Sequence, residues 1–318
     1  MIQSSSAKLV IIGLGLIGGS LAAALKKREA ILDDAKDTKR EIVGIVRRQE
    51  TADIALQENL VDRAFLSLEE VAPELKSGDI IFIAVPTLSV PNTLADIKRY
   101  VSDQVTITDG ASVKGSVVEG VKQVYGVMPP QFVPGHPIAG SEKSGVTAAN
   151  PDLYVDHRII LTPLPETGHD HLNRVADLWR LVEAEVLMMS VEEHDAVLAA
   201  TSHLPHAIAY SLVDTLANDS ENENIFRYAA GGFRDFTRIA SSDPTMWHDI
   251  MCANSDSVLE AIDLFQKNLN CMRQAIADQN SDALLTIFNR AKVARDEFAS
   301  LSALPVGTNK SSADKDCS

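Results

Sequence analysis

Short apolar runs alternate with amphipathic segments along the first half of the chain. An apolar run of this kind predicts a strand, and an amphipathic segment predicts a helix. Strands alternating with helices favour a parallel sheet with right-handed crossovers. The expected strands are Leu9–Ile12, Glu41–Val46, Ala64–Leu66, Asp79–Pro86, Val105–Thr108 and Gln131–Pro134, and the expected helices include Leu21–Lys27, Leu94–Tyr100 and Lys114–Gln123.

The second half of the chain is mostly helical in its spacing. Strands are expected at Arg158–Pro163 and Ala184–Met189 with a helix over 168–182 between them, so the sheet is expected to extend beyond the minimal fold. From Val191 onward the spacing is helical nearly to the end. It predicts a helix over Val191–Ala217 that is interrupted near Leu204-Pro205, and long helices over Thr245–Leu269 and Cys271–Phe298.

These patterns predict an α/β fold, in which a Rossmann-type, doubly wound parallel sheet is followed by an all-helical C-terminal domain. We expect a dinucleotide-binding domain over 1–190, a helical substrate and dimerisation domain over 191–303, and a disordered polar tail over 304–318. The long helices carry more apolar residues than a lone helical lobe can hide, which predicts a homodimer that exchanges helices. These residues are Ile250, Val258, Leu259, Ile262, Leu264, Phe265, Met272, Ile276, Leu284, Leu285, Ile287 and Phe288.

The composition is that of a soluble globular protein with small-molecule partners. The net charge of −15 over 318 residues argues against nucleic acid, because phosphate binding needs a basic face. No apolar run approaches the roughly 18 residues that span a bilayer, and residues 1–8 do not resemble a secretory signal. The three cysteines lack metal-ligand spacing, which favours a reduced, cytoplasmic setting.

A glycine-rich turn joins the first strand to the first helix, with the sequence Gly13-Leu14-Gly15-Leu16-Ile17-Gly18. This G-x-G-x-x-G pattern between a strand and a helix predicts dinucleotide binding, the alternative being an ordinary glycine-rich turn. Gly13 permits the tight turn, Gly15 lets the backbone approach a pyrophosphate, and Gly18 allows the helix to pack closely. The N–H groups at the start of the helix then face the phosphates.

The end of the second strand favours NADP over NAD. An NAD-binding domain would carry a carboxylate here for the ribose 2′-hydroxyl, but the chain has Arg47 and Arg48 and no carboxylate before Glu50. The planar guanidinium suits a 2′-phosphate. The alternative is that both arginines are solvated surface charges.

Candidate chemistry gathers just past the carboxyl ends of the expected strands, where parallel sheets bind ligands. Val85, Pro86 and Thr87 follow one strand, and we expect Thr87 to line the nicotinamide region. Ser112 follows another, and either contacts a substrate hydroxyl or caps the next helix. His136 lies in a glycine- and proline-rich loop, 135–145, at the seam between the domains, and we interpret it as the catalytic residue.

Two clusters in the helical half remain. His203 and His206 share a helical face, but no third ligand of matching spacing predicts a metal site, and His203 is interpreted as a structural histidine. The segment 230–238 is interpreted as an anion-binding loop, in which Arg238 can hold a carboxylate bidentately.

These residues together resemble the prephenate dehydrogenase family, which includes arogenate and cyclohexadienyl dehydrogenases. Five motifs carry the resemblance across most of the chain and in family order. They are GLGLIGGSLA at 13–22, DGASVK at 109–114, GHPIAGSEKSG at 135–145, SHLPHAIA at 202–209 and GGFRDFTRIASSDPTMW at 231–247.

The resemblance implies an oxidative decarboxylation of prephenate to 4-hydroxyphenylpyruvate in tyrosine biosynthesis, with NADP or NAD as cofactor. It implies that His136 and Ser112 hydrogen-bond the C4 hydroxyl of the substrate and that Arg238 pairs with the ring carboxylate. Ser141 and His206 are implied nearby, with His206 toward the substrate side chain. The remaining implied residues are a gate made by Glu142 with Arg234 and Asp235, and Gly231 and Trp247 from the neighbouring subunit.

One residue departs from the family pattern, since Arg234 stands where some relatives carry lysine, and we expect its pairing with Glu142 to persist with an altered geometry. The uncharged Ser144 and the lack of an added carboxylate beside it favour prephenate over arogenate. A different hydroxyacid dehydrogenase would rely on a lysine in the helical domain, and none stands in a comparable motif. A non-catalytic NADP sensor would leave His136, Ser112 and Arg238 unexplained together.

Overall fold

The computed structural model describes residues 7–31, 40–141, 143–218 and 225–302. The predicted tail over 304–318 and the candidate gate residue Glu142 lie outside these residues. The described chain divides into two compact units, one up to Val258 and one from Leu259.

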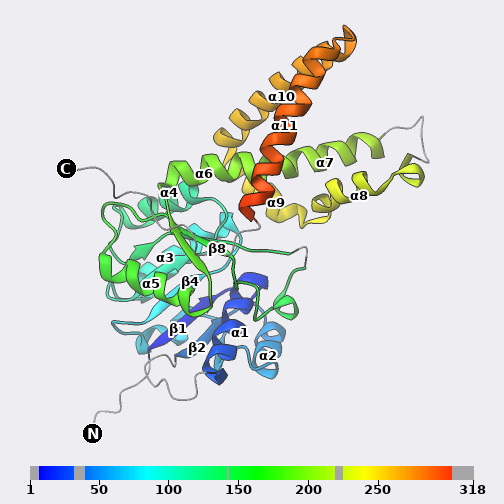
Figure 1. The fold of residues 1–318 in the computed structure, drawn as a ribbon. Helices are drawn as coiled ribbons and strands as arrows, with labels where there is room; N and C mark the ends of the chain where they lie inside the picture. The colour runs from blue at the N-terminus through cyan, green and yellow to red at the C-terminus, as the bar shows by residue number, and fades with distance from the viewer. Residues whose placement is uncertain (1–6, 32–39, 142, 219–224, 303–318) are drawn as a thin grey trace, which may run out of the picture. The chain divides into compact units, whose positions relative to one another are not determined.

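A six-stranded parallel sheet forms the centre of the first unit (Figure 1). Its strand order, β3-β2-β1-β4-β5-β6, is that of the Rossmann fold, and it confirms the predicted fold class. Every pair of neighbouring strands is parallel. The strands are β1 (Lys8–Ile12), β2 (Glu41–Ile45), β3 (Arg63–Phe65), β4 (Ile80–Ile83), β5 (Thr106–Asp109) and β6 (Phe132–Val133).

Helices cover both faces of this sheet, which explains why its strands are apolar runs rather than alternating ones. Along β1, Leu9 and Ile11 belong to one buried cluster, while Val10 and Ile12 belong to the other. The connecting elements are α1 (Leu16–Ile31), α2 (Gln49–Gln57), η1 (Leu68–Glu70), η2 (Ala72–Glu74), η3 (Thr87–Ser89), α3 (Val90–Tyr100) and α4 (Lys114–Tyr125).

The chain after β6 forms a separate three-stranded sheet of order β7-β8-β9 and does not extend the first sheet, so that prediction is wrong. The segment 135–145, which we expected to be a loop, begins with a strand. This strand can contain Pro137 because it lies at the edge of the sheet, where a missing N–H is tolerated. The elements are β7 (Gly135–Ile138), η4 (Val146–Ala148), β8 (Arg158–Leu161), α5 (His169–Leu181) and β9 (Glu185–Met188).

A run of helices completes the first unit. The predicted interruption near Leu204-Pro205 is a π-helical turn, η5 (Ala199–His203), between α6 (Val191–Leu198) and α7 (Leu204–Ala217). The segment predicted as an anion-binding loop is mostly helical. It forms α8 (Gly231–Thr237) and η7 (Arg238–Ser241), after η6 (Ile225–Tyr228). Its two glycines stand at the start of α8, where they do not interrupt the helix.

The boundaries of the last helices also differ from those predicted. A helix expected over Thr245–Leu269 is divided at Asn254 into α9 (Pro244–Ala253) and α10 (Ser255–Ala277). The next break falls at 278–280, before α11 (Ser281–Ser302), because Gln279 has a positive φ of 50° and Asn280 accepts the backbone N–H of Ala283 at 3.0 Å.

One described stretch, Val191–Ala217, is long and apolar enough to cross a membrane by length and composition. Its first half, however, holds the buried polar residues His194, Asp195 and His203, which hydrogen-bond to protein partners. Lipid offers no such partners. The first half of this stretch therefore packs against the rest of the protein, and its apolar length exceeds what we predicted for the chain.

Candidate active site

The end of β5 and the start of β7 are joined by a buried ion pair between Asp109 and Lys114, both fully buried. Asp109 Oδ1 accepts the N–H of Gly135 at 3.2 Å, and Lys114 Nζ donates to the carbonyl of Gly135 at 2.6 Å. Both backbone groups of Gly135 are therefore held, and the next residue in the chain is His136. Asp109 and Lys114, at the two ends of the motif 109–114, thus fix the backbone that carries the candidate base, His136.

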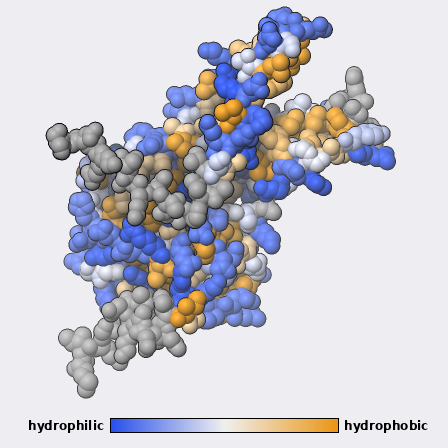
Figure 2. All heavy atoms as spheres, in the orientation of Figure 1, coloured by the Kyte–Doolittle hydropathy of each residue, from blue (hydrophilic) through white to orange (hydrophobic). Residues whose placement is uncertain are grey.

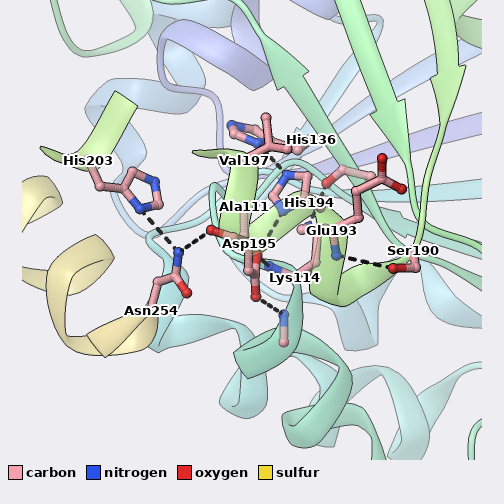
Figure 3. Close-up of polar contacts among 12 residues, drawn as sticks. Ala111, Lys114, His136, Ser190, Glu193, His194, Asp195, Val197, His203 and Asn254 are labelled. Carbon is pink, nitrogen blue, oxygen red and sulfur yellow. Dashed lines mark hydrogen bonds and ion pairs between the residues drawn. The ribbon is translucent and has the colours of Figure 1, made fainter. Parts of the chain in front are cut away.

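His136 lies at one end of a polar chain that leads into α6 (Figure 3). Its Nδ1 lies 2.9 Å from Nε2 of His194, and Nδ1 of His194 lies 2.7 Å from Oδ1 of Asp195. The second ring nitrogen of His136, Nε2, makes no hydrogen bond to the described residues. That nitrogen is therefore available to a ligand.

Burial keeps both histidines neutral. His136 is 8% exposed, and burial lowers its pKa well below the usual value, with further lowering by His194 and Lys114. Burial likewise lowers the pKa of His194, although the hydrogen bond to Asp195 opposes this. A neutral imidazole with a free nitrogen can accept a proton, which is what a general base requires.

Ser112 does not cap the helix that follows it. The N-cap residue of α4 is Val113, which makes no side-chain hydrogen bond, and the first two N–H groups of α4 donate instead to the Asp195 carboxylate. Ser112 has no side-chain hydrogen bond to the described residues. Of the two roles that the sequence left open, the one that requires a cap is therefore not observed.

A row of histidines continues from His136 toward the helical residues. His203 is near enough to lower the pKa of His136, and burial lowers the pKa of His203 itself to about 4. Asn254 Nδ2 donates to the carbonyl of Asp195 at 2.9 Å and lies 3.2 Å from His203 Nδ1, as Figure 3 shows. Within the described residues, no His, Cys, Asp and Glu side chains gather into a metal-binding group.

The row ends at His206 and Trp247, whose rings stack with centroids 3.5 Å apart. The resemblance implies Trp247 from the neighbouring subunit, but here it packs on His206 of its own chain and is buried. Burial lowers the pKa of His206, and the charge of Arg238, in η7, which packs against α7, lowers it further.

The other candidate substrate residues are exposed. Ser141 accepts the N–H of Lys143 at 3.2 Å, and Arg234 lies 3.7 Å from its neighbour Asp235. Gly231 begins α8 on the surface. None of these contacts joins the row of histidines. Within the described residues, hydrogen-bond and ring contacts join His136 to His194, and His203 and His206 to Trp247, but do not bring Ser141, Arg234 or Gly231 to them.

The glycine-rich turn has the shape that a dinucleotide needs. Gly13 has φ +98°, and a Cβ there would lie 2.4 Å from the carbonyl oxygen of Ala84. A Cβ at Gly18 would lie 2.0 Å from the carbonyl oxygen of Gly13, whereas a Cβ at Gly15 would meet nothing within 4 Å. The first and last glycines thus permit close packing, and the middle one faces open space at the start of α1, where a pyrophosphate fits.

The remaining cofactor candidates lie at the same edge of the sheet. Arg47 and Arg48 follow β2 and are exposed, and Arg48 is the N-cap residue of α2. Thr87 is buried at the start of η3, and α9 packs against η3. Leu14 is buried, whereas Leu16, Ile17 and Val85 are partly buried and Pro86 is exposed.

Sequence reasoning missed His194 and Asp195 as members of the site. Their signal was weak, because a histidine and an aspartate near the start of a helix usually face solvent. Lys114 and Asp109 lie in the motif at 109–114, from which the sequence predicted no role for either side chain. Their pairing depends on bringing β5, α4 and β7 together, which only the fold shows.

A Rossmann domain with an open glycine turn, and a neutral buried histidine at the same edge of its sheet, define a nicotinamide-dependent oxidoreductase. Residues 32–188 match the family model of the prephenate dehydrogenase nucleotide-binding domain, and residues 190–290 match that of the prephenate dehydrogenase dimerization domain. The chain therefore belongs to the prephenate dehydrogenase family. These matches confirm the predicted family and the predicted homodimer.

Individual relatives agree with this assignment. The chain is 36% identical over 290 residues to the cyclohexadienyl dehydrogenase of Zymomonas mobilis, covering 90% of this chain and 94% of that protein. It is 36% identical over 296 residues to the prephenate dehydrogenase of Bacillus subtilis, covering 91% and 75%. The crystal structure of Aquifex aeolicus prephenate dehydrogenase with hydroxyphenyl propionate and NAD+ matches with a TM-score of 0.84 at 35% identity, covering 93% of this chain and 99% of that one.

Proposed function

We propose that this protein oxidatively decarboxylates prephenate to 4-hydroxyphenylpyruvate, with NADP as its preferred cofactor. The observation that carries the proposal is the buried, neutral His136, whose free Nε2 lies at the edge of the sheet where the glycine turn would hold the cofactor. We assign substrate binding to the helical domain from residue 191 and place the protein in the cytoplasm, where the thiols of Cys252 and Cys271, both free, stay reduced.

In this proposal His136 Nε2 accepts the proton of the C4 hydroxyl as a carbonyl develops, and Ser112 donates a hydrogen bond to the same oxygen. A nicotinamide bound at the glycine turn would supply the acceptor for the hydride that leaves C4. The bond to the ring carboxylate then breaks with loss of carbon dioxide, its electron pair completes the aromatic ring, and His136 returns the proton to the phenolic oxygen. Because aromatisation drives this loss, the residues mainly align the substrate.

The helical residues would bind the two ends of the substrate. Arg238 pairs with the ring carboxylate, and His206, held against Trp247, lies toward the side chain. Ser141, Glu142, Gly231 and Arg234 are proposed at the entrance, with Glu142 and Arg234 opposed in charge. Substrate specificity would be set here, since arogenate differs from prephenate only in its side chain.

Initial rates with prephenate or arogenate and with NAD or NADP test the function directly. We expect prephenate with NADP to give the highest kcat/KM. Faster turnover of arogenate would favour the alternative, an arogenate or dual-specificity cyclohexadienyl dehydrogenase. Oxidation of small hydroxyacids without turnover of either cyclohexadienyl substrate would contradict the proposal.

The cofactor preference rests on Arg47 and Arg48, which stand exposed after β2 with no carboxylate before Glu50. Charge-assisted hydrogen bonds contribute about 1.5–3 kcal/mol each. The double variant Arg47→Ser, Arg48→Ser should therefore raise KM for NADP by roughly 10²–10⁴-fold. KM for NAD serves as the internal control and should change little, and an equal rise for both cofactors would rule out recognition of a 2′-phosphate.

A further inference from the structure

Asp195 occupies a position where two parts of the site meet. Its Oδ1 lies 2.7 Å from His194 Nδ1 and accepts the N–H of Lys114 at 2.9 Å, and its Oδ2 accepts the N–H of Gly115 at 2.7 Å. The carboxylate thus caps α4 from α6, which lies about eighty residues away in the sequence. It comes so close that a Cβ at Gly115 would lie 2.8 Å from Oδ2.

The hydrogen bonds of this carboxylate determine which nitrogens of the two histidines carry protons. An ionised carboxylate only accepts hydrogen bonds, so Nδ1 of His194 must carry a proton. Because His194 is neutral, its Nε2 is then an acceptor, and it can only accept from a protonated Nδ1 of His136. The lone pair of His136 is thereby left on Nε2, the nitrogen with no partner among the described residues.

The other end of the carboxylate acts on Ser112. Residues Lys114 and Gly115 begin α4, and Val113 offers no side-chain oxygen to cap it. The turn that carries Ser112 is therefore anchored by the hydrogen bonds that Asp195 accepts from the N–H groups of Lys114 and Gly115. The Asp195 carboxylate therefore both anchors the turn that carries Ser112 and determines the tautomer of His136.

We propose that Asp195, acting through His194, is a positioning residue that aligns His136 and Ser112 on one substrate hydroxyl. The inference rests on the proposed roles of these two residues in proton transfer. Asp195 itself contacts neither substrate nor cofactor. It acts by fixing the proton on His136 Nδ1 and by fixing the start of α4.

The variant Asp195→Asn tests both effects. Asparagine keeps only one oxygen, so one of the two N–H groups at the start of α4 loses its acceptor, and an amide nitrogen in the place of Oδ1 faces His194 Nδ1 as a donor. In that orientation both histidines take the opposite tautomer, with a proton on His136 Nε2, where the base needs a lone pair. In a Ser-His-Asp triad the same change leaves the geometry intact and lowers kcat about 10⁴-fold.

We expect Asp195→Asn to lower kcat at least about 100-fold while KM for substrate changes less than about threefold. Glu192→Gln is the matched control, since it removes a carboxylate from an exposed position in the first turn of the same helix. Its kcat should match that of the unmodified protein. A kcat of Asp195→Asn equal to that of this control would overturn the proposal.

A second pair of variants leaves the cap of α4 untouched, so it remains informative if Asp195→Asn does not fold. In His194→Gln, the amide can accept from His136 with its oxygen and donate to Asp195 with its nitrogen, so the tautomer of His136 is kept. In His194→Ala the acceptor for His136 Nδ1 is missing, so the tautomer of His136 is no longer fixed. We expect the glutamine variant to retain kcat within about tenfold and the alanine variant to lose more than about 100-fold; equal losses would contradict the relay.

The tautomer can also be measured without substrate, by nitrogen NMR of the histidine-labelled protein. In the unmodified protein His136 should show a protonated Nδ1 and an unprotonated Nε2, and the two signals should exchange character in Asp195→Asn. Unchanged signals in Asp195→Asn would overturn the inference. If instead the signals exchange but the unmodified protein does not turn over prephenate or arogenate, the proposed function fails and the relay stands.

Discussion

A single side chain, His136, tests the proposed chemistry most directly. Asparagine at this position can still hydrogen-bond the C4 hydroxyl but cannot take up its proton. Because a positioned general base contributes about 10²–10⁴-fold, we expect His136→Asn to lower kcat by that amount with little change in KM. Steady-state rates and equilibrium binding of substrate measure the two effects, and near-normal turnover would remove His136 from the mechanism.

Arg238 is expected to affect binding more than chemistry. Its guanidinium can form two parallel hydrogen bonds with a carboxylate, whereas a lysine ammonium acts as a point charge. We expect Arg238→Gln to raise KM for prephenate by roughly 10–100-fold, and Arg238→Lys to fall between this variant and the unmodified protein. The two KM values, measured at saturating cofactor, check this, and an unchanged KM in Arg238→Gln would rule out the carboxylate role.

The π-helical turn η5 carries His203, which contacts Asn254 at the end of α9, and this contact makes the stability of the protein depend on pH. His203 Nδ1 lies 3.2 Å from Asn254 Nδ2, a donor, so this nitrogen is an acceptor and must stay unprotonated. Burial accordingly lowers the pKa of His203 to about 4 in the folded chain, compared with about 6.5 when unfolded. Between these values the unfolded chain binds the extra proton, so stability falls as the pH falls from about 6.5 toward about 4.

We expect the free energy of unfolding to decrease between pH 7 and pH 5 by about 2 kcal/mol from this residue alone. Urea unfolding at both pH values measures the decrease. The variant His203→Gln keeps an acceptor for Asn254 but cannot titrate, so its decrease should be smaller by that amount. The same pH dependence in both proteins would contradict the buried neutral state of His203.

Other elements show how far local patterns reach. The strands of the main sheet lie where the apolar runs predicted them, because burial on both faces leaves an uninterrupted signal. The segment 230–238 was misinterpreted as a loop because Gly231 and Gly232 suggested a turn, yet they stand at the start of α8. The break after α10 was placed too early because the apolar spacing continues past residue 270.

At the scale of the whole molecule, the last two helices carry apolar side chains that the single chain leaves in contact with water. Figure 2 shows apolar side chains along α10 and α11. Among the most exposed are Leu264 at 62%, Ile276 at 59% and Phe298 at 60%. The match to a dimerization domain over 190–290 assigns a second copy of the chain to this region.

Replacing one of these residues should therefore weaken the dimer. Burying a leucine contributes about 1.5–3 kcal/mol, and the two-fold symmetry of a homodimer counts each substitution twice. We expect Leu264→Glu to raise the dimer dissociation constant by roughly 10²–10⁴-fold, as measured by sedimentation at several concentrations. Gln266→Glu, which adds the same charge at an exposed polar position of α10, is the control. Equal dissociation constants for the two variants would exclude Leu264 from the interface.

The sequence by itself determined the features that depend on neighbouring residues. The glycine turn, the parallel strands and most helices are encoded by contiguous spacing, and the candidate base was identified because His136 stands between a glycine and a proline. Five motifs in order were enough to indicate the family. Arg47 and Arg48 follow β2 in the sequence, so the NADP proposal also depends only on neighbouring residues.

The tertiary structure decided what holds those residues in place. His136 meets His194 across 58 residues, and Asp195 caps α4 across 81. Such pairs have no periodic signature, because each depends on where two distant elements cross. Burial lowers the pKa of His136 and His203 only once the chain has folded around them, so the protonation states that the chemistry needs are a property of the packed molecule.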